Sequence, residues 1–204
     1  MVLRFLTILS ISLLWANSLI AQNQSRSVPE PAAKGPGADI AFGYSNLTLN
    51  LSGRPTVNLN GGDVSTTLDF SSRWGATFDS SYVRAGRDAG SGHSTYVLSV
   101  LAGPVFVPMQ TENTRLLVRV LGGIGLVDGS TPVGQLYFRG WESHFSWAVG
   151  TGIERNVSGP FAVRVFADYL RTQFIGNSGT LEPQNNIRFT GSLVWRFGGR
   201  RPSR

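Results

Sequence analysis

The feature of this sequence that most constrains its fold is a two-residue alternation of apolar and polar residues, which recurs along most of the chain. Its clearest instance runs through 187–197, where Ile187, Leu193 and Phe197 share one face and charged or small residues fill the other. Side chains alternate between the two faces of a β-strand, whereas an amphipathic helix needs apolar residues every three or four positions. No stretch after residue 37 keeps the helical spacing, so the sequence predicts an all-β domain.

The alternation predicts eight strands. Their alternating cores are 40–44, 64–70, 74–82, 96–100, 116–124, 145–153, 161–169 and 187–197. The segments between them alternate in length, with short ones at 71–73, 106–114 and 155–160 and mostly longer ones at 45–63, 84–94, 127–143 and 175–186. Short turns at one end and longer loops at the other are typical of membrane barrels. We therefore expect an eight-stranded antiparallel up-and-down transmembrane β-barrel.

One segment departs from this pattern. Leu47, Leu49 and Leu51 stand in the opposite phase to Phe42. A strand whose apolar residues change phase either contains an extra residue or has ended. We expect a β-bulge near Asn46 or the end of the first strand there.

The polar face of the predicted strands carries balanced charges. Its acids are Asp39, Asp69, Asp79, Glu154 and Asp168, and its bases are Arg115, Arg119, Arg164, Arg188 and Arg196. Arginine supplies 17 of the 18 basic residues of the chain, and arginine is preferred where a charge is held in a fixed geometry. An unpaired charge in a narrow interior would cost several kcal/mol. We expect a luminal ion-pair network that includes Asp69, Asp79, Arg119, Glu154, Arg164, Asp168 and Arg188 and seals the lumen.

A soluble barrel with its apolar face inside is the alternative to a membrane barrel. The aromatic residues of the apolar face favour the membrane. At the loop end they are Tyr44, Tyr82, Tyr96, Phe145, Trp147 and Tyr169, and at the turn end Phe70, Trp74, Phe161, Trp195 and Phe197. Two separate bands match the two interfaces of a bilayer. A soluble core gives no reason for this sorting.

The ends of the chain suggest export. Residues 1–21 have one basic residue, an apolar run and small residues before a cleavage site after Ser18 or Ala21, which is typical of a signal peptide. Residues 22–37 are polar and rich in proline and glycine, which predicts a disordered leader. The barrel is then expected over 38–197, followed by a tail over 198–204. Cysteine is absent, which excludes disulfides and thiol catalysis.

Several segments resemble the transmembrane domain of the OmpA family of small outer-membrane barrels. Residues 42–45 (FGYS) with 57–62 (VNLNGG) are similar to its first strand and loop, and 167–174 (ADYLRTQF) to its seventh strand. Residues 189–197 look like its terminal strand, which ends in phenylalanine. The resemblance implies the bacterial outer membrane, outer-membrane lipids and lipopolysaccharide as surroundings, and the barrel-assembly machinery as the partner that reads Trp195 and Phe197. Here seven residues follow Phe197, a departure from the family pattern.

An enzymatic function has one candidate motif. His144-Phe145-Ser146, with Glu142 or Glu154, resembles the His-x-Ser pair of an outer-membrane lipid A deacylase. His144 and Ser146 nevertheless share the luminal phase, whereas attack on an acyl chain requires the nucleophile on the lipid side. We expect no enzyme, and the sequence shows no cluster of metal ligands and no cofactor motif.

The net charge of +6 would also suit a nucleic-acid-binding protein. Most strand arginines are assigned inward, so we expect no nucleic-acid partner. The outer arginines suit lipopolysaccharide phosphates better, and they are Arg54, Arg84, Arg87, Arg139 and Arg171. The sequence thus predicts a non-enzymatic outer-membrane barrel that supports the envelope or binds an unknown surface ligand through its loops. A narrow diffusion channel is the alternative, and a lipid-facing hydrolase the third.

Overall fold

The chain forms eight β-strands and no helix within the residues that the structure describes. The structure is a computed structural model, and it describes residues 37–50, 56–85, 95–133, 136–175 and 181–197, with the backbone alone at 129–133, 136–140, 174–175 and 181–182. The strands are β1 (Gly37–Leu49), β2 (Val57–Asp69), β3 (Trp74–Ala85), β4 (Thr95–Gln110), β5 (Thr114–Val133), β6 (Leu136–Ser158), β7 (Phe161–Ile175) and β8 (Leu181–Phe197). In this part of the chain no helix is long and apolar enough to cross a membrane.

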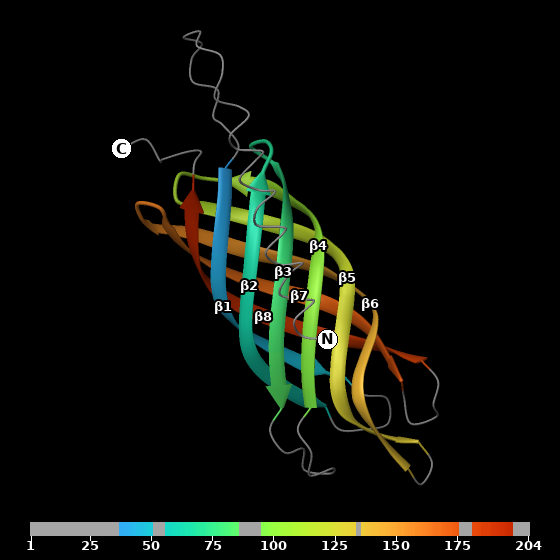
Figure 1. The fold of residues 1–204 in the computed structure, drawn as a ribbon. Coiled ribbons are helices and arrows are strands. Elements are labelled where there is room, and N and C mark those ends of the chain that lie inside the picture. Colours follow the sequence, from blue (N-terminus) through green and yellow to red (C-terminus); the bar gives the residue numbers. More distant parts are fainter. Residues whose placement is uncertain (1–36, 51–55, 86–94, 134–135, 176–180, 198–204) are drawn as a thin grey trace. The chain divides into compact units, whose positions relative to one another are not determined.

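The strands follow one another around a closed barrel in chain order (Figure 1). Every neighbouring pair is antiparallel, and β1 closes the barrel against β8. A closed sheet leaves no strand edge with unpaired backbone groups, which a bilayer requires. The predicted fold class is therefore confirmed.

The strands are longer than the sequence predicted. β4 continues to Gln110 and β5 begins at Thr114, and β5 and β6 reach Val133 and Leu136. The segment 127–143 was expected to be a long loop, and this was wrong because its described residues, 127–133 and 136–143, pair as strands. Glycine and proline indicate only where a strand can end. Here backbone pairing with the neighbouring strand continues past several of these residues.

The expected break in the first strand was also wrong. β1 pairs with β2 from Gly37 to Leu49 without a shift in register. Leu47 and Leu49 point into the lumen, in the same phase as Asp39. The change of phase in the sequence therefore indicates that the inner face of β1 changes from polar to apolar residues toward the loop end.

The outer face of the barrel is apolar. Many large side chains on this face are 38–66% exposed, among them Phe42, Tyr44, Phe70, Trp74, Tyr82, Phe145, Phe161, Tyr169, Trp195 and Phe197. A monomer in water rarely exposes contiguous apolar surface on this scale. Aromatic contacts join neighbouring strands at both ends, with ring centroids 6.0 Å apart for Tyr82–Tyr96 and 4.7 Å for Trp74–Phe106. This surface is suited to a bilayer.

Candidate functional site

Four charged side chains form an arginine–aspartate ring (Asp79, Arg119, Asp168 and Arg188) in the lumen. They come from β3, β5, β7 and β8, so the ring joins opposite walls of the barrel. Arg119 donates to both carboxylate oxygens of Asp168, at 2.9 and 2.7 Å, and to Asp79 at 3.0 Å. Arg188 Nη1 donates to Asp79 at 2.7 Å and Arg188 Nε to Asp168 at 3.0 Å. Each charge thus meets two opposite charges, which compensates for its removal from water.

A second group of charges, the turn-end cluster, lies closer to the short turns. It consists of Asp39, Asp69, Arg115, Glu154, Arg164 and Arg196. Glu154 is at its centre, because it pairs with all three arginines. Arg164 also pairs with Asp39 at 2.7 Å, and Arg115 with Asp69 at 3.2 Å. Three acids and three bases leave the cluster formally neutral.

The arginine–aspartate ring needs space that two glycines of β6 provide. A Cβ at Gly150 would lie 1.9 Å from Asp168 Oδ1, and one at Gly152 would lie 2.5 Å from the ring of Phe166. Phe166 points inward and its ring lies 3.8 Å from the guanidinium carbon of Arg119, a cation–π geometry. Phe166 was not predicted as a luminal residue, although it has the same inward phase on β7 as Arg164 and Asp168.

The loop half of the lumen is filled by a leucine-rich cluster. Its members are Leu47, Leu49, Leu59, Val83, Ala85, Val97, Leu101, Leu121, Ala148 and Leu170, each 4% exposed or less. They come from seven of the eight strands and pack against one another, so the cluster spans the lumen. We expected ion pairs to seal the lumen, so this apolar layer was not predicted. The phase of Leu47 and Leu49 was interpreted as a bulge or the end of the first strand, and the apolar inward residues of the other strands were not singled out.

The structure brings together all seven residues predicted for the luminal network. Asp79, Arg119, Asp168 and Arg188 form the ring, and Asp69, Glu154 and Arg164 join the turn-end cluster. The same network contains Asp39, Arg115 and Arg196, which were also assigned inward.

Asp63 is a luminal acid that sequence reasoning missed. It lies on β2 and is 3% exposed, and it forms no ion pair within the described part of the chain. Its Oδ2 has no hydrogen-bond partner, and neither do Ser45 Oγ on β1 and Thr190 Oγ1 on β8. These strands are neighbours, and Ser45 is in register with Thr190. Buried polar atoms without partners are typical of places where water is bound.

The structure does not join His144 and Ser146 through the imidazole ring. Both side chains have the luminal phase of β6. Ser146 Oγ donates to the backbone oxygen of His144 at 3.5 Å, and no hydrogen bond joins it to the His144 ring. Glu154 is occupied by three arginines. Within the described residues, no group of three or more potential ligands could hold a metal ion.

Trp195 and Phe197 lie on the outer face at the end of β8. Their ring centroids are 4.5 Å apart, and Trp195 also contacts Phe161 of β7. Both rings are exposed to the bilayer side and sit in the turn-end aromatic band. Of the arginines expected to face lipopolysaccharide, Arg84 and Arg171 lie on the outer face near the loop end. Arg54 and Arg87 lie outside the described residues, and only the backbone is described at Arg139.

These features define a class of protein: a closed transmembrane β-barrel with an apolar outer face and a filled lumen. Its fold is similar to that of Ail, the attachment invasion locus protein of Yersinia pestis, at 22% identity and a TM-score of 0.55, covering 79% of this chain and 98% of that one. Ail in complex with the heparin analogue sucrose octasulfate matches at 20% identity and a TM-score of 0.56, covering 79% and 99%. Neisserial surface protein A matches at 11% identity and a TM-score of 0.60, covering 80% and 100%.

No protein-family model matches this sequence. No curated protein sequence matches it either. The resemblance to small outer-membrane barrels of the OmpA type is confirmed at the level of the fold by these solved structures. The predicted localisation, the bacterial outer membrane, agrees with the closed barrel and its apolar outer face.

Proposed function

We propose that this protein is a non-enzymatic outer-membrane barrel with a sealed lumen, which supports the envelope or binds a surface ligand through its loops. The observation that supports a sealed lumen is that two layers of side chains, one charged and one apolar, occupy it. Asp79, Arg119, Asp168 and Arg188 pair across the lumen, and the leucine-rich cluster fills it on the loop side. An eight-stranded barrel is only wide enough for side chains to fill it.

The proposal includes the ends of the chain. Residues 1–21 act as a signal peptide for export, the residues between 21 and β1 form a leader, β1 to β8 form the barrel up to Phe197, and 198–204 form a tail. The loop end faces outward, toward lipopolysaccharide and any surface ligand, and the short turns face the periplasm. This orientation is typical of bacterial outer-membrane barrels.

The lumen is tested by electrical recording. We expect the refolded wild-type protein to give no steady conductance in planar phospholipid bilayers, because two layers of buried side chains occupy the lumen of a barrel of this width. A porin reconstituted in the same bilayers serves as the positive control. Large and reproducible wild-type channels that discriminate between anions and cations would refute the sealed lumen and favour the diffusion channel.

Assembly is proposed to depend on Trp195 and Phe197, as the barrel-assembly machinery reads an aromatic terminal strand. The Phe197→Glu variant should give less folded barrel in cells, since it places a charge in the turn-end aromatic band. Phe70→Glu is the matched control, because it places the same charge in that band but away from β8. Folded barrel is measured by heat-modifiable migration on a gel. Equal losses in both variants would show a general effect of charge and contradict recognition of β8.

A further inference from the structure

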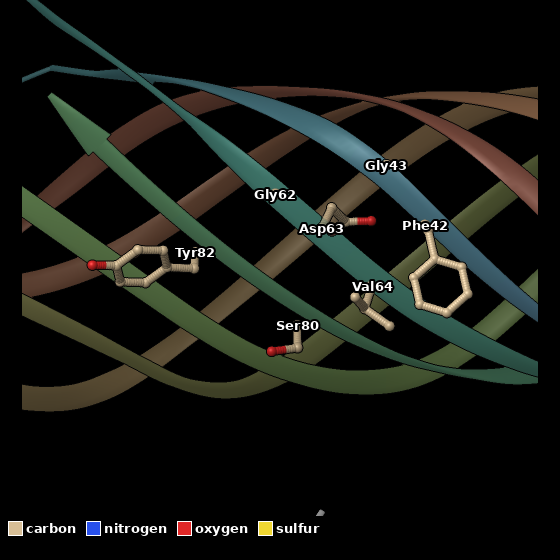
Figure 2. Close-up of a pocket in the computed structure, with 7 residues that line it drawn as sticks. All are labelled: Phe42, Gly43, Gly62, Asp63, Val64, Ser80 and Tyr82. Atoms are coloured by element: carbon tan, nitrogen blue, oxygen red, sulfur yellow. The ribbon is translucent and has the colours of Figure 1, made fainter. Parts of the chain in front are cut away.

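The outer wall of the barrel contains a lipid-facing groove on β1, β2 and β3. It has a volume of about 440 Å³ and is lined by Phe42, Gly43, Gly62, Asp63, Val64, Ser80 and Tyr82 (Figure 2). The side chains of Phe42, Val64 and Tyr82 face the outside, because they have the outward phase of their strands. The groove therefore opens toward the bilayer.

The groove exists because Gly62 has no side chain. In the sheet Gly62 is in register with Tyr44 on one side and Tyr82 on the other, so a gap separates two tyrosines of the outer aromatic band. A Cβ at Gly62 would meet only the backbone oxygen of Gly43, at 4.0 Å. Nothing in the backbone geometry therefore requires glycine here. In a bilayer a gap of this size is filled by a hydrocarbon chain, because an empty one forfeits dispersion contacts on both sides.

Polar groups border the loop end of the groove. Asn60 and Arg84 are in register with each other, one outward position beyond Gly62 and Tyr82. Tyr44 Oη and Asn46 Nδ2 donate to Asn60 Oδ1, at 2.8 and 2.7 Å, which fixes the Asn60 amide. Arg84 is exposed and has no ion-pair partner among the described side chains. A hydrogen-bond donor and an exposed arginine thus lie where a chain in the groove would meet its headgroup.

We propose that this groove binds one acyl chain of lipid A, with the Arg84 guanidinium and the Asn60 amide holding a phosphate of the same molecule. Lipid A fits this site because it combines several acyl chains with phosphates on a compact sugar headgroup. Guanidinium groups pair with phosphate oxygens in a bidentate geometry. The assignment rests on the proposed function, since it requires the loop end to face the outer leaflet.

Binding is measured by native mass spectrometry of the refolded barrel in detergent titrated with purified lipid A. We expect one lipid A to bind the wild type with a defined affinity. Gly62→Leu fills the groove and should weaken binding about tenfold. Gly122→Leu is the matched control: Gly122 has the outward phase of β5, and a Cβ there makes only ordinary contacts at 3.9 Å with Phe145. This control should bind as the wild type does.

The headgroup is tested separately. Arg84→Gln should weaken binding of lipid A about tenfold, and Arg171→Gln, another outward arginine at the loop end, should not. Dephosphorylated lipid A should bind the wild type and Arg84→Gln equally weakly. Phosphatidylglycerol in place of lipid A separates the two phosphate sources, and equal affinity for it would overturn the choice of lipid A.

Failure of the groove and failure of the proposed function are distinguishable. Each variant is first checked for heat-modifiable migration, which reports a folded barrel independently of lipid. If the folded variants Gly62→Leu and Gly122→Leu bound lipid A alike, the groove proposal would be refuted while the sealed barrel stood. If the wild type did not fold into a heat-modifiable barrel at all, the proposed function itself would fail.

Discussion

The two halves of the lumen have opposite chemistry although the same strands build both. On β3 the inward residues change from Asp79 and Ser81 to Val83 and Ala85. The outward face changes in the opposite sense at the same level, from Tyr82 to Arg84. The outer faces of β1 and β2 also become polar at this level. Asn46 of β1 and Asn60 of β2 are in register with each other, and Asn60 is in register with Arg84.

This difference shows that the medium outside a barrel decides which of its faces is apolar. Tyr44 and Tyr82 belong to the loop-end aromatic band, here called the tyrosine band. On the turn side of this band the outer face meets hydrocarbon, and the charges lie inside the barrel in ion pairs. On the loop side of the band, asparagine and threonine cover the outer face, and Thr48 Oγ1 donates to Asn58 Oδ1 at 3.0 Å. There Leu47, Leu49 and Leu59 fill the inside, as in a soluble barrel. One sheet therefore continues from a membrane barrel into a water-facing one without a break in register.

The largest expected effect breaks the charged half. Arg188→Met keeps most of the side-chain volume but leaves Asp79 and Asp168 with Arg119 as their only shared partner. The free energy of unfolding should fall by about 4 kcal/mol, because a buried charge loses its compensation. Urea-induced unfolding in phospholipid vesicles, followed by tryptophan fluorescence, measures it.

A second substitution tests the cause of this loss. Adding Asp79→Asn to Arg188→Met removes one acid along with the base and restores the charge balance of the ring. The double variant should recover part of the lost stability. If the double variant were destabilised by the sum of the two single effects, uncompensated charge would not explain the loss.

The second prediction breaks the apolar half. Leu59 is fully buried in the leucine-rich cluster. Leu59→Ala should lower the free energy of unfolding by about 3 kcal/mol, through lost burial and the cavity left behind. Leu68→Ala, on the lipid-facing side of the same strand, is the control and should cost less, since lipid chains can fill the space. Equal losses at both positions would mean that the cluster packs no more tightly than the lipid-facing surface.

Sequence analysis predicted the charged half better than the apolar half. Alternation alone assigned Asp79, Arg119, Asp168 and Arg188 to one face, because in the membrane part every charged strand residue of the network has the inward phase, although small apolar clusters such as Val105, Leu117 and Phe166 share that face. The partner of each charge could not be predicted, since it depends on strand register and on how the tilted strands meet across the lumen. Ail and the other structural neighbours share the fold at identities too low to assign such pairs.

The apolar half of the lumen was missed because the prediction from alternation assumed that every inward residue is polar. Leu47 and Leu49 break that assumption where β1 passes the tyrosine band. Asp63 was missed for a different reason: residues 57–62 are rich in asparagine and glycine and suggest a loop. Gly61 is in fact a strand residue at a close approach, since a Cβ there would lie 1.9 Å from the backbone oxygen of Tyr82.

The smallest expected effect concerns Asp63, which lies at the boundary of the two halves. The ring and the turn-end cluster balance five carboxylates against five arginines, so Asp63 is the sixth luminal acid and is without an ion-pair partner in the described part of the chain. Asp63→Asn keeps the shape of the side chain and removes the unpaired charge. At neutral pH it should raise the free energy of unfolding by about 1 kcal/mol, because the lost desolvation penalty exceeds the lost attraction to more distant arginines.

Asp79→Asn is the comparison for this last substitution, since the same chemical change there removes a carboxylate that holds two guanidinium groups. Urea unfolding of both variants at neutral pH should show stabilisation for Asp63→Asn and destabilisation for Asp79→Asn. The contrast depends only on pairing, because both acids are buried on the inner face of neighbouring strands. If Asp63→Asn destabilised the barrel as much as Asp79→Asn, Asp63 would belong to the ring, and the charged half would extend up to the leucine-rich cluster.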